Sequence, residues 1–325
     1  MNLLSTFLQR AILQGVPILY GANGEILTEK AGNLNLGIPG IMYMGGVSGL
    51  IAAFFYERAA GDRASGLLGL LVSLCAALLV SMLAGLLYSF LTVTLRANQN
   101  VVGLSLTTFG VGFGNFFGGS LSQLAGGVGQ ISTKLTAAAY RQSLPGLSGL
   151  PFVGKAFFSF GFLTYLSIAL SLCLAFLLTG TRKGLEIRAV GEDPAAADAA
   201  GVDVNRVKYV STVVGAALAG GLCFVMEYLG GTWANDGFGD RGWLAVALVI
   251  LSVWNARKAI WGSFLFGGLY ILYLYIPGLN RSAQELFKML PYLATILVLI
   301  QTGRRNRPED QPPASLGLSY FREER

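Results

Sequence analysis

A run of polar side chains interrupts the apolar N-terminal part of the chain at Gly24–Gly40. The run, GEILTEKAGNLNLGIPG, includes two carboxamides, Asn33 and Asn35, which can donate and accept hydrogen bonds to hydroxyl groups or to the edge of a base. Gly37 and Gly40 flank a proline before the apolar sequence resumes. Polar, broken backbone at membrane depth is tolerated only where protein or a watery cavity covers it. The run therefore suits a solute path, although an ordinary turn between two helices explains it equally well.

A second set of candidate groups lies in the fourth apolar stretch, at residues 101–120. Phe109, Phe113 and Phe116 offer aromatic faces on which a planar solute could stack, and Asn115 adds a carboxamide. Helix packing is the simpler role for any one of these aromatic side chains. These side chains are candidates for the solute path because they would lie in one membrane span.

The residue types needed for acid–base and metal chemistry are scarce. The chain has no His, and its three Cys include no CxxC pair, so the sequence predicts neither a zinc site nor a cofactor bound by this chain. The octet Gly149–Ala156, GLPFVGKA, nearly matches a phosphate-binding loop, but Ala156 lacks the hydroxyl group that holds magnesium. No nucleophile is paired with a base. We therefore expect neither an intramembrane enzyme nor ATP hydrolysis by this chain alone.

The basic loop 180–208 contains a segment built like a short, capped helix. In LEIRAVGEDPAAADAAGV, two carboxylates precede Pro194, which suits the first position of a helix. The run Ala195–Ala200 favours helix, and Gly201 is a typical stop. A short helix between two membrane spans suits rigid docking to another protein, whereas a surface helix without a partner is the alternative interpretation.

Composition and apolar length predict the elements that position these groups. Of 325 residues, 54% are hydrophobic and 12% charged, compared with roughly 25% charged residues in soluble domains. Several apolar stretches reach the about 20 residues that a membrane-spanning helix needs. We expect an all-α, polytopic transmembrane bundle of about nine spans, with a broken or re-entrant element near residues 24–40. The spans are predicted at residues 5–23, 34–56, 66–95, 101–120, 158–179, 209–229, 243–256, 259–277 and 289–302.

Small residues four apart predict where these helices approach closely. Gly110, Gly114 and Gly118 share one apolar span, and Gly215 precedes Ala219 in another. Residues without bulky side chains at this spacing let two helix backbones come together in a membrane.

The distribution of Lys and Arg predicts the orientation. Basic residues concentrate on the cytoplasmic side of spans, and both the loop 180–208 and the region after residue 303 are rich in them. Four predicted spans separate the two, so both fall inside, and the N-terminus falls outside. We divide the chain into a transmembrane domain, 1–303, and a cytoplasmic tail, 304–325, which its prolines and charges mark as solvated and partly disordered. The net charge of +6 indicates orientation, not binding to nucleic acid.

Several of these stretches resemble the permease subunits of nucleoside and simple-sugar ABC importers, relatives of ribose permeases and, more distantly, of branched-chain amino-acid permeases. EKAGNLNLGIPG at Glu29–Gly40 resembles their ERAG-x-x-NLG-x-EG signature, with Pro39 where Glu is usual. Leu185–Val202 resembles their LRAVGENP-x-AA-x-x-x-G segment. Gly237–Gly268 resembles their GRGW-x-A-x-A and later LFGG pattern, with Ser252 where Gly is usual and Ala256 where Pro is usual. The similarity extends over most of the chain.

The resemblance implies a translocation subunit driven by separate ATPase subunits, which use ATP and magnesium. It also implies a second permease chain, paralogous rather than identical, an extracytoplasmic solute-binding (lipo)protein, a lipid bilayer around the chain, and a place in the bacterial plasma (inner) membrane. The solute stays open among nucleosides, free bases, riboflavin-like molecules and simple sugars. An ion-coupled secondary transporter is the alternative, disfavoured because Asp and Glu lie almost entirely at the ends of the predicted spans.

Two groups of residues are predicted to carry this function. The translocation path comprises Asn33, Asn35, Gly37, Gly40, Phe109, Phe113, Asn115 and Phe116. The coupling segment, which the resemblance implies docks on the ATPase, comprises Arg188, Gly191, Glu192, Asp193, Pro194, Ala195, Ala196 and Gly201.

Overall fold

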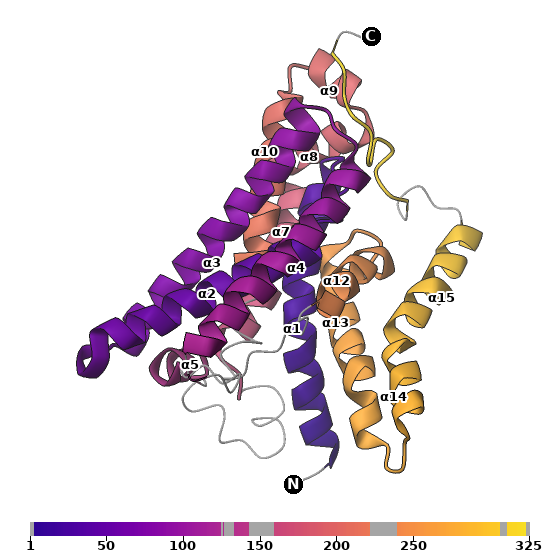
Figure 1. Cartoon of the computed structure of the whole chain (residues 1–325). Helices are drawn as coiled ribbons and strands as arrows, with labels where there is room; N and C mark the ends of the chain where they lie inside the picture. The colour runs from indigo at the N-terminus through magenta and orange to yellow at the C-terminus, as the bar shows by residue number, and fades with distance from the viewer. Residues whose placement is uncertain are drawn as a thin grey trace.

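One long helix, α1 (Leu3–Lys30), runs through the middle of the bundle and packs against α13, α12, α10 and α7 (Figure 1). Nearly every residue of α1 from Ala11 to Glu29 is buried. The computed structural model describes residues 3–124, 126, 133–142, 159–221, 239–305 and 311–322. Within these residues the chain is organised around α1 as a central helix.

All regular secondary structure in the described residues is helical, which confirms the predicted all-α class. After α1 come α2 (Ile38–Ala60), the short 3-10 helix η1 (Gly61–Arg63), α3 (Gly66–Ser89) with its π-helical end η2 (Phe90–Thr94), α4 (Gln99–Leu124), α5 (Lys134–Tyr140), α7 (Phe162–Gly180), α8 (Arg182–Glu192), α9 (Pro194–Ala199), α10 (Val204–Ala216) with its π-helical end η4 (Ala217–Gly221), α12 (Gly239–Leu251), α13 (Ala256–Ile271), η6 (Leu272–Tyr275), α14 (Arg281–Lys288) and α15 (Leu290–Arg305).

Five helical stretches in the described residues are long and apolar enough to cross a membrane, so the chain is a multi-pass membrane protein. They are Ile38–Arg63, Gly66–Thr94, Gln99–Leu124, Phe162–Gly180 and Arg281–Gln301, and they match five of the predicted spans. The predicted count of about nine is not confirmed. α12 and α13 have 13 and 16 residues, fewer than the about 20 that a span needs. The predicted span 209–229 is described only to Gly221.

The predicted break near residues 24–40 is shorter than expected. α1 continues to Lys30 and α2 begins at Ile38, so only Ala31–Gly37, named here the α1–α2 connection, is not helical. The polar residues at the end of α1 do not break it, because neighbouring protein surrounds them and the helix satisfies their backbone groups. Gly32, at φ +83, ends the helix in the left-handed conformation that glycine adopts most readily.

Glycines allow the helices to cross in backbone contact, as the spacing predicted. A Cβ atom built on Gly110 of α4 would lie 2.5 Å from the Cα atom of Gly40 in α2. One built on Gly215 of α10 would lie 2.5 Å from the carbonyl oxygen of Gly24 in α1. Neither crossing has room for a side chain, so any larger residue would force the helices apart.

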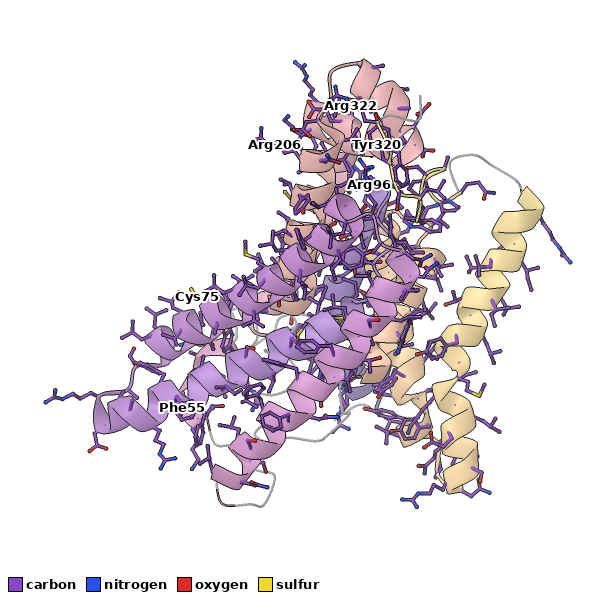
Figure 2. The ribbon with its side chains drawn as sticks, turned by 45° about the horizontal axis from the view of Figure 1, so that its top comes forward. Phe55, Cys75, Arg96, Arg206, Tyr320 and Arg322 are labelled. Carbon is purple, nitrogen blue, oxygen red and sulfur yellow. The ribbon has the colours of Figure 1, made fainter. Side chains whose placement is uncertain are left out.

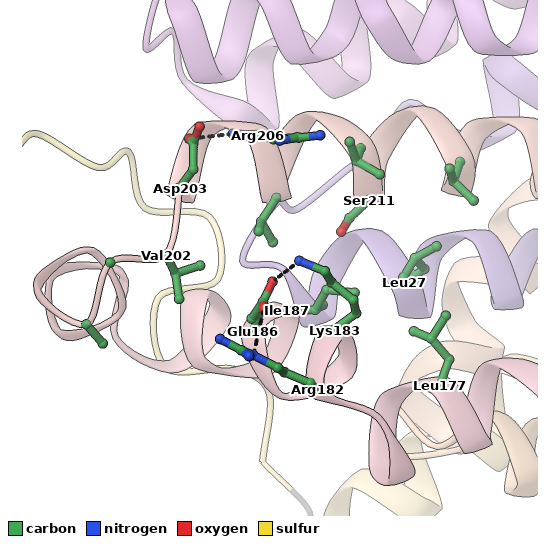
Figure 3. Close-up of a pocket in the computed structure, with 15 residues that line it drawn as sticks. Leu27, Leu177, Arg182, Lys183, Glu186, Ile187, Val202, Asp203, Arg206 and Ser211 are labelled. Carbon is green, nitrogen blue, oxygen red and sulfur yellow. Dashed lines mark hydrogen bonds and ion pairs between the residues drawn. The ribbon is translucent and has the colours of Figure 1, made fainter.

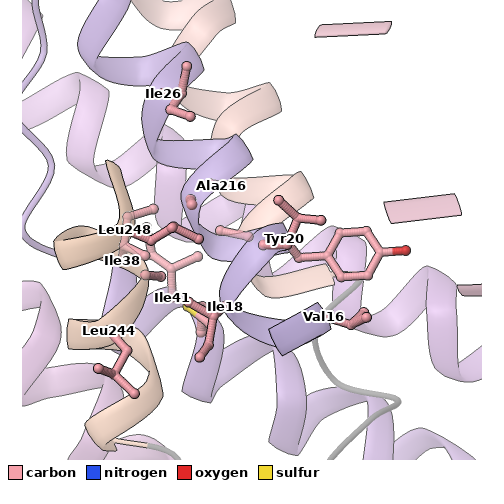
Figure 4. Packing of buried hydrophobic residues seen from close by; sticks show 14 of the residues in the cluster. Val16, Ile18, Tyr20, Ile26, Ile38, Ile41, Ala216, Leu244 and Leu248 are labelled. Carbon is pink, nitrogen blue, oxygen red and sulfur yellow. The ribbon is translucent and has the colours of Figure 1, made fainter. Parts of the chain in front are cut away.

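Branched apolar side chains fill the space between α1, α2 and α12 (Figure 4). Ile26 of α1, Ile38 of α2 and Leu248 of α12 are fully buried there. Lipid tails are as apolar as these side chains, so close van der Waals packing, not exclusion from water, holds such contacts together in a membrane.

Large apolar side chains also cover the outward faces of α3 and α15. They include Leu67, Leu71, Leu79, Leu83 and Leu86 on α3, and Leu293, Ile296, Leu297 and Ile300 on α15. Phe55 of α2 and Cys75 of α3 likewise point away from the bundle (Figure 2). A soluble monomer rarely exposes an apolar surface of this extent to water. In a bilayer, lipid tails cover such a surface.

Candidate functional site

Four segments that are far apart in the sequence meet at one end of the bundle, which we name the basic end. They are the α1–α2 connection, the turn before α4, the helices α8 and α9, and residues Gln311–Arg322. Figure 1 shows α8, α9 and the C-terminal residues together at the top, with the N-terminus at the opposite end. Basic side chains gather at this end: Arg96, Arg206 and Arg322 lie there in Figure 2, and Arg182, Lys183 and Arg188 belong to α8.

The short capped helix predicted in the basic loop is present as α9. The Asp193 carboxylate accepts hydrogen bonds from the backbone N–H groups of Ala195 and Ala196, both at 3.0 Å, and Pro194 holds the first position. Gly201 follows the helix at φ +85, where glycine is favoured. The preceding helix, α8, ends at Glu192, so Glu192 belongs to α8 and only Asp193 caps α9.

The outer surface of α8 and α9 is free to meet a partner. Leu185 is 58% exposed, and Arg188, Glu192, Asp193, Ala195, Ala196 and Gly201 are exposed as well. Among the predicted coupling residues, Gly191 is buried and Pro194 is partly buried. Small apolar side chains surrounded by charges of both signs make a surface that can dock in a groove of another protein.

Asn33 and Asn35 lie in the α1–α2 connection, and both side chains are completely buried. The Asn33 amide donates to Thr212 Oγ1 of α10 at 2.9 Å, and Asn35 Oδ1 accepts from the backbone N–H of Gly37 at 3.0 Å. Asn33 Oδ1 and Asn35 Nδ2 have no hydrogen-bond partner within the described part of the chain. Each carboxamide is therefore held from one side and has hydrogen-bonding capacity left on the other.

Two buried carboxylates support the connection from α1. Glu25 Oε1 accepts a hydrogen bond from the backbone N–H of Asn35 at 3.2 Å, and Glu29 accepts one from the indole N–H of Trp254. Trp254 and Val253 both adopt positive φ angles, of 51° and 56°. A β-branched residue rarely adopts this conformation, which costs on the order of 1–3 kcal/mol and is found mainly where function requires it.

Gln99, in the first turn of α4, links the connection to the C-terminal residues. Its side chain is 2% exposed, accepts a hydrogen bond from the backbone N–H of Leu34 at 2.7 Å and donates one to the carbonyl oxygen of Leu318 at 3.3 Å. Tyr88 of α3 donates to the carbonyl oxygen of Leu34 at 2.6 Å. Thus α3 and α4 are both tied to the α1–α2 connection.

The sequence profile for the family described as the permease component of branched-chain amino acid transport systems matches residues 7–299. This match covers most of the chain, including α1, the connection, α8 and α9. The chain belongs to this permease family.

Individual relatives extend over nearly the whole permease. It is 29% identical to a guanosine ABC transporter permease of Bacillus subtilis, over 100% of this chain and 99% of the relative. It is 29% identical to a nucleoside ABC transporter permease of Lactococcus lactis, over 92% of each chain. A Haloferax volcanii ABC transporter permease, provisionally named for glucose, is 29% identical over 99% of each chain. The chain is thus the membrane-spanning permease subunit of an ATP-binding-cassette transporter.

The predicted path residues of the permease lie in two groups, one on the connection with the start of α2 and one on α4. Gly37 and Gly40 are buried beside Asn33 and Asn35, at the connection and the start of α2. Phe109 and Phe116 lie on α4 and are 58% and 68% exposed. α4 runs beside the connection and the start of α2: Thr107 donates to the carbonyl oxygen of Leu36 at 2.7 Å, and Gly110 lies against the backbone of Gly40.

The other two path candidates on α4 lie closer to neighbouring side chains. Asn115 Oδ1 accepts a hydrogen bond from the Tyr43 hydroxyl of α2 at 2.6 Å. The Phe113 ring packs against that of Phe117, with 4.6 Å between the ring centroids. A cavity of about 290 Å³ between α3 and α4 is lined by Tyr88 and Phe109, and it adjoins this aromatic face.

A larger cavity, of about 540 Å³, is lined by α8 on one side and α10 on the other (Figure 3). Leu27 of α1 and Leu177 of α7 form part of its apolar wall, while Arg206 lies on the α10 side. On the α8 side, Glu186 pairs with Lys183 at 2.7 Å. This pocket lies behind α8, on the side that faces α10.

The prediction of a solvated, partly disordered tail is wrong for residues Gln311–Arg322. Pro313 and Ser315 are buried, and the segment lies across the basic end. The prolines and charges of the segment indicated disorder. Its backbone N–H groups, however, donate hydrogen bonds to the backbone of distant elements, and composition does not reveal such pairing. Residues 306–310 and 323–325 of the predicted tail lie outside the described residues, as do most of the loop 125–158 and Gly149–Ala156.

Proposed function

We propose that this permease imports an uncharged, hydroxyl-rich solute of the nucleoside or simple-sugar class, driven by separate ATPase subunits. The observation that carries the proposal is the α8–α9 surface, an exposed, capped pair of helices that contacts the α1–α2 connection through Gly191. A Cβ atom on Gly191 would lie 2.3 Å from the carbonyl oxygen of Lys30, so the two segments are in backbone contact. Movement imposed on α9 by a partner would therefore reach the connection directly.

Asn33 and Asn35 are our proposed solute-binding groups. Their unpaired Oδ1 and Nδ2 atoms could accept and donate hydrogen bonds to a solute, or to water that precedes it. Phe109, Phe113 and Phe116 would offer stacking surface further along the path. Relatives named for guanosine, for nucleosides and provisionally for glucose support a polar, uncharged solute, because all three ligands share hydroxyl groups.

The remaining partners follow from the same proposal. The ATPase subunits would dock on Arg188, Glu192, Asp193, Pro194, Ala195, Ala196 and Gly201. A second, paralogous permease would complete the path, and a solute-binding (lipo)protein would deliver cargo from outside the plasma membrane. The apolar outer faces of α3 and α4 are available for the second permease or for lipid.

Uptake by the complete transporter in proteoliposomes tests the proposal. The vesicles contain this chain, its second permease and its ATPase subunits, with the binding protein added outside. We expect accumulation of radiolabelled guanosine or glucose that requires internal ATP and persists when ionophores collapse all ion gradients. Uptake that follows an ion gradient without ATP would contradict the proposal and favour a secondary transporter. A thermal-shift screen of the binding protein against nucleosides, free bases, riboflavin and sugars would identify the solute.

A further inference from the structure

The C-terminal segment Gln311–Arg322 adds hydrogen bonds to the junction at which Gly191 of α8 meets the α1–α2 connection. At its centre lies Ser315, which is 6% exposed. Ser315 donates from its backbone N–H to the carbonyl oxygen of Gly191 at 3.0 Å, and from its hydroxyl group to the same oxygen at 2.6 Å. Two residues later, the backbone N–H of Gly317 donates to the carbonyl oxygen of Gly32 at 3.3 Å. Ser315 and Gly317 thus bond α8 and the α1–α2 connection, respectively.

Close packing makes this junction rigid. Built Cβ atoms on Gly191 and Gly32 would lie 2.3 Å from the carbonyl oxygen of Lys30 and 2.9 Å from Ser315 Oγ, respectively. Gly32 and Gly317 both adopt left-handed φ angles, of +83° and +81°, which bring their backbones to this meeting point. The Ser315 side chain fills the space beside Gly32 and Gly191, so one of these segments cannot slide without displacing the others.

The far end of the segment is attached to α9. Tyr320 donates its hydroxyl hydrogen to Asp198 Oδ2 at 2.7 Å, and Arg322 pairs with the same oxygen at 3.1 Å. Tyr320 also packs against a small apolar cluster of Val190, Ala197 and Val204, which joins α8, α9 and α10. Figure 2 shows Tyr320, Arg322 and Arg96 gathered beside this end of the chain.

The turn before α4 adds a third attachment. The Gln99 side chain bonds both Leu34 and Leu318, and the guanidinium group of Arg96 lies 4.6 Å from the centroid of the Phe321 ring. The segment therefore reaches α9 at one end, α8 and the connection at the other, and α4 between them.

We infer that Ser315 and Tyr320 are positioning residues, and that Gln311–Arg322 acts as a strap that makes α8, α9 and the α1–α2 connection move as one body. The inference rests on the proposed function, since it assigns to the strap the transfer of motion from docked ATPase to the solute path. Without the strap, Gly191 of α8 would still contact the connection and α10 would still hold Asn33, but the hydrogen bonds from Ser315 and Gly317 that bind α8 to the connection would be lost.

Truncation after residue 310 tests the strap in the complete, reconstituted transporter. We expect the truncated permease to keep ATP hydrolysis in the assembled complex while transporting at least about fivefold less solute per ATP, because several hydrogen bonds to the junction are lost. Ser315→Ala should reduce the ratio in the same direction. Leu318→Ala is the matched control, since it trims a side chain that is 61% exposed and keeps the carbonyl group that Gln99 binds. An unchanged solute-to-ATP ratio in the truncated protein would overturn the inference.

A thiol-labelling experiment tests, independently of transport, whether the strap stays attached to α8. Ser315→Cys is placed in the full chain after the three native cysteines have been replaced, and thiol labelling is measured without nucleotide and with the ATPase trapped in its ATP-bound state. A strap that moves with α8 keeps the thiol protected in both states. Rapid labelling in either state means that the segment detaches during the cycle, which refutes the inference even if truncation prevents assembly.

The same two experiments separate this inference from the proposed function. If the unmodified transporter accumulates no nucleoside and no sugar, the proposed function fails, while protection of the thiol at position 315 still reports whether the strap remains attached. If the unmodified transporter works and the truncated one keeps its solute-to-ATP ratio, only the strap is refuted.

Discussion

Asn33 is held by a partner that can be altered without touching Asn33 itself, which allows its role to be isolated. Thr212→Val removes the hydroxyl group that accepts the 2.9 Å hydrogen bond, and Asn33→Ala removes the carboxamide. If Asn33 binds solute, we expect Asn33→Ala to raise the KM for uptake about tenfold, equivalent to about 1.4 kcal/mol, and Thr212→Val to change it much less. Equal effects of both substitutions would mean that Asn33 only supports the fold.

Gly191 and Gly201 both belong to the predicted coupling segment, but other atoms pack closely only around Gly191. A Cβ atom on Gly191 would collide with the backbone of Lys30, whereas nothing lies within 4 Å of one on Gly201. We expect Gly201→Ala to cost about 1 kcal/mol, from its positive φ alone. Gly191→Ala should cost about 1–3 kcal/mol and also displace the connection. Thermal unfolding in detergent and uptake assays check this: only Gly191→Ala should impair uptake, and a reversed order would contradict the packing.

Local sequence revealed the residues whose partners are close in the chain. The Asp193 cap, Pro194 and Gly201 act within one helix, so their spacing was sufficient to predict α9. Glu29, Gln99 and Ser315 were not predicted as functional, because their partners are Trp254, Leu318 and Gly191, each at least 120 residues away or on another helix. The burial of Glu25 and Glu29 was also unforeseen, since α1 continues through a stretch that its polarity marked as broken.

At the scale of elements, the α8–α9 surface should be the point where hydrolysis is coupled to transport. Glu192→Lys reverses a charge on the exposed surface and removes the acceptor of the Ala314 N–H, and Gly201→Pro alters the end of α9. We expect both variants to insert and to bind the ATPase weakly, so that ATP is hydrolysed with little uptake. Normal ATP-driven uptake in both variants would exclude docking on α9. Membrane insertion, checked by fractionation, is the control.

Long apolar helices were the most predictable elements, and short ones the least. α2, α3, α4 and α7 agree with their predicted ranges because continuous apolar sequence leaves few alternatives. α12 and α13 are too short to span alone, and α14 joins α15 into a longer stretch than the predicted 289–302. Apolar length therefore located the helices but not which of them cross the membrane by themselves.

At the scale of the whole molecule, the two ends of the bundle should face opposite compartments. η1 lies far from α9 in Figure 1, and basic residues mark the α9 end as cytoplasmic. We expect a cysteine introduced at Asp62 to react with a membrane-impermeant thiol reagent in intact cells. One at Asn205 should react only after permeabilisation. Replacing the native cysteines provides the background, and the opposite pattern would reverse the orientation.

The position of the strap in the chain also sets the order in which the molecule is completed. Ser315 follows α15, so a ribosome must deliver every described helix before the contact with Gly191 can form. Until then the bonds of Tyr320 and Arg322 to Asp198 are also missing, so α9 is held by fewer contacts. Because the strap positions α9, the docking surface reaches its final position only after residues 311–322 have been synthesised.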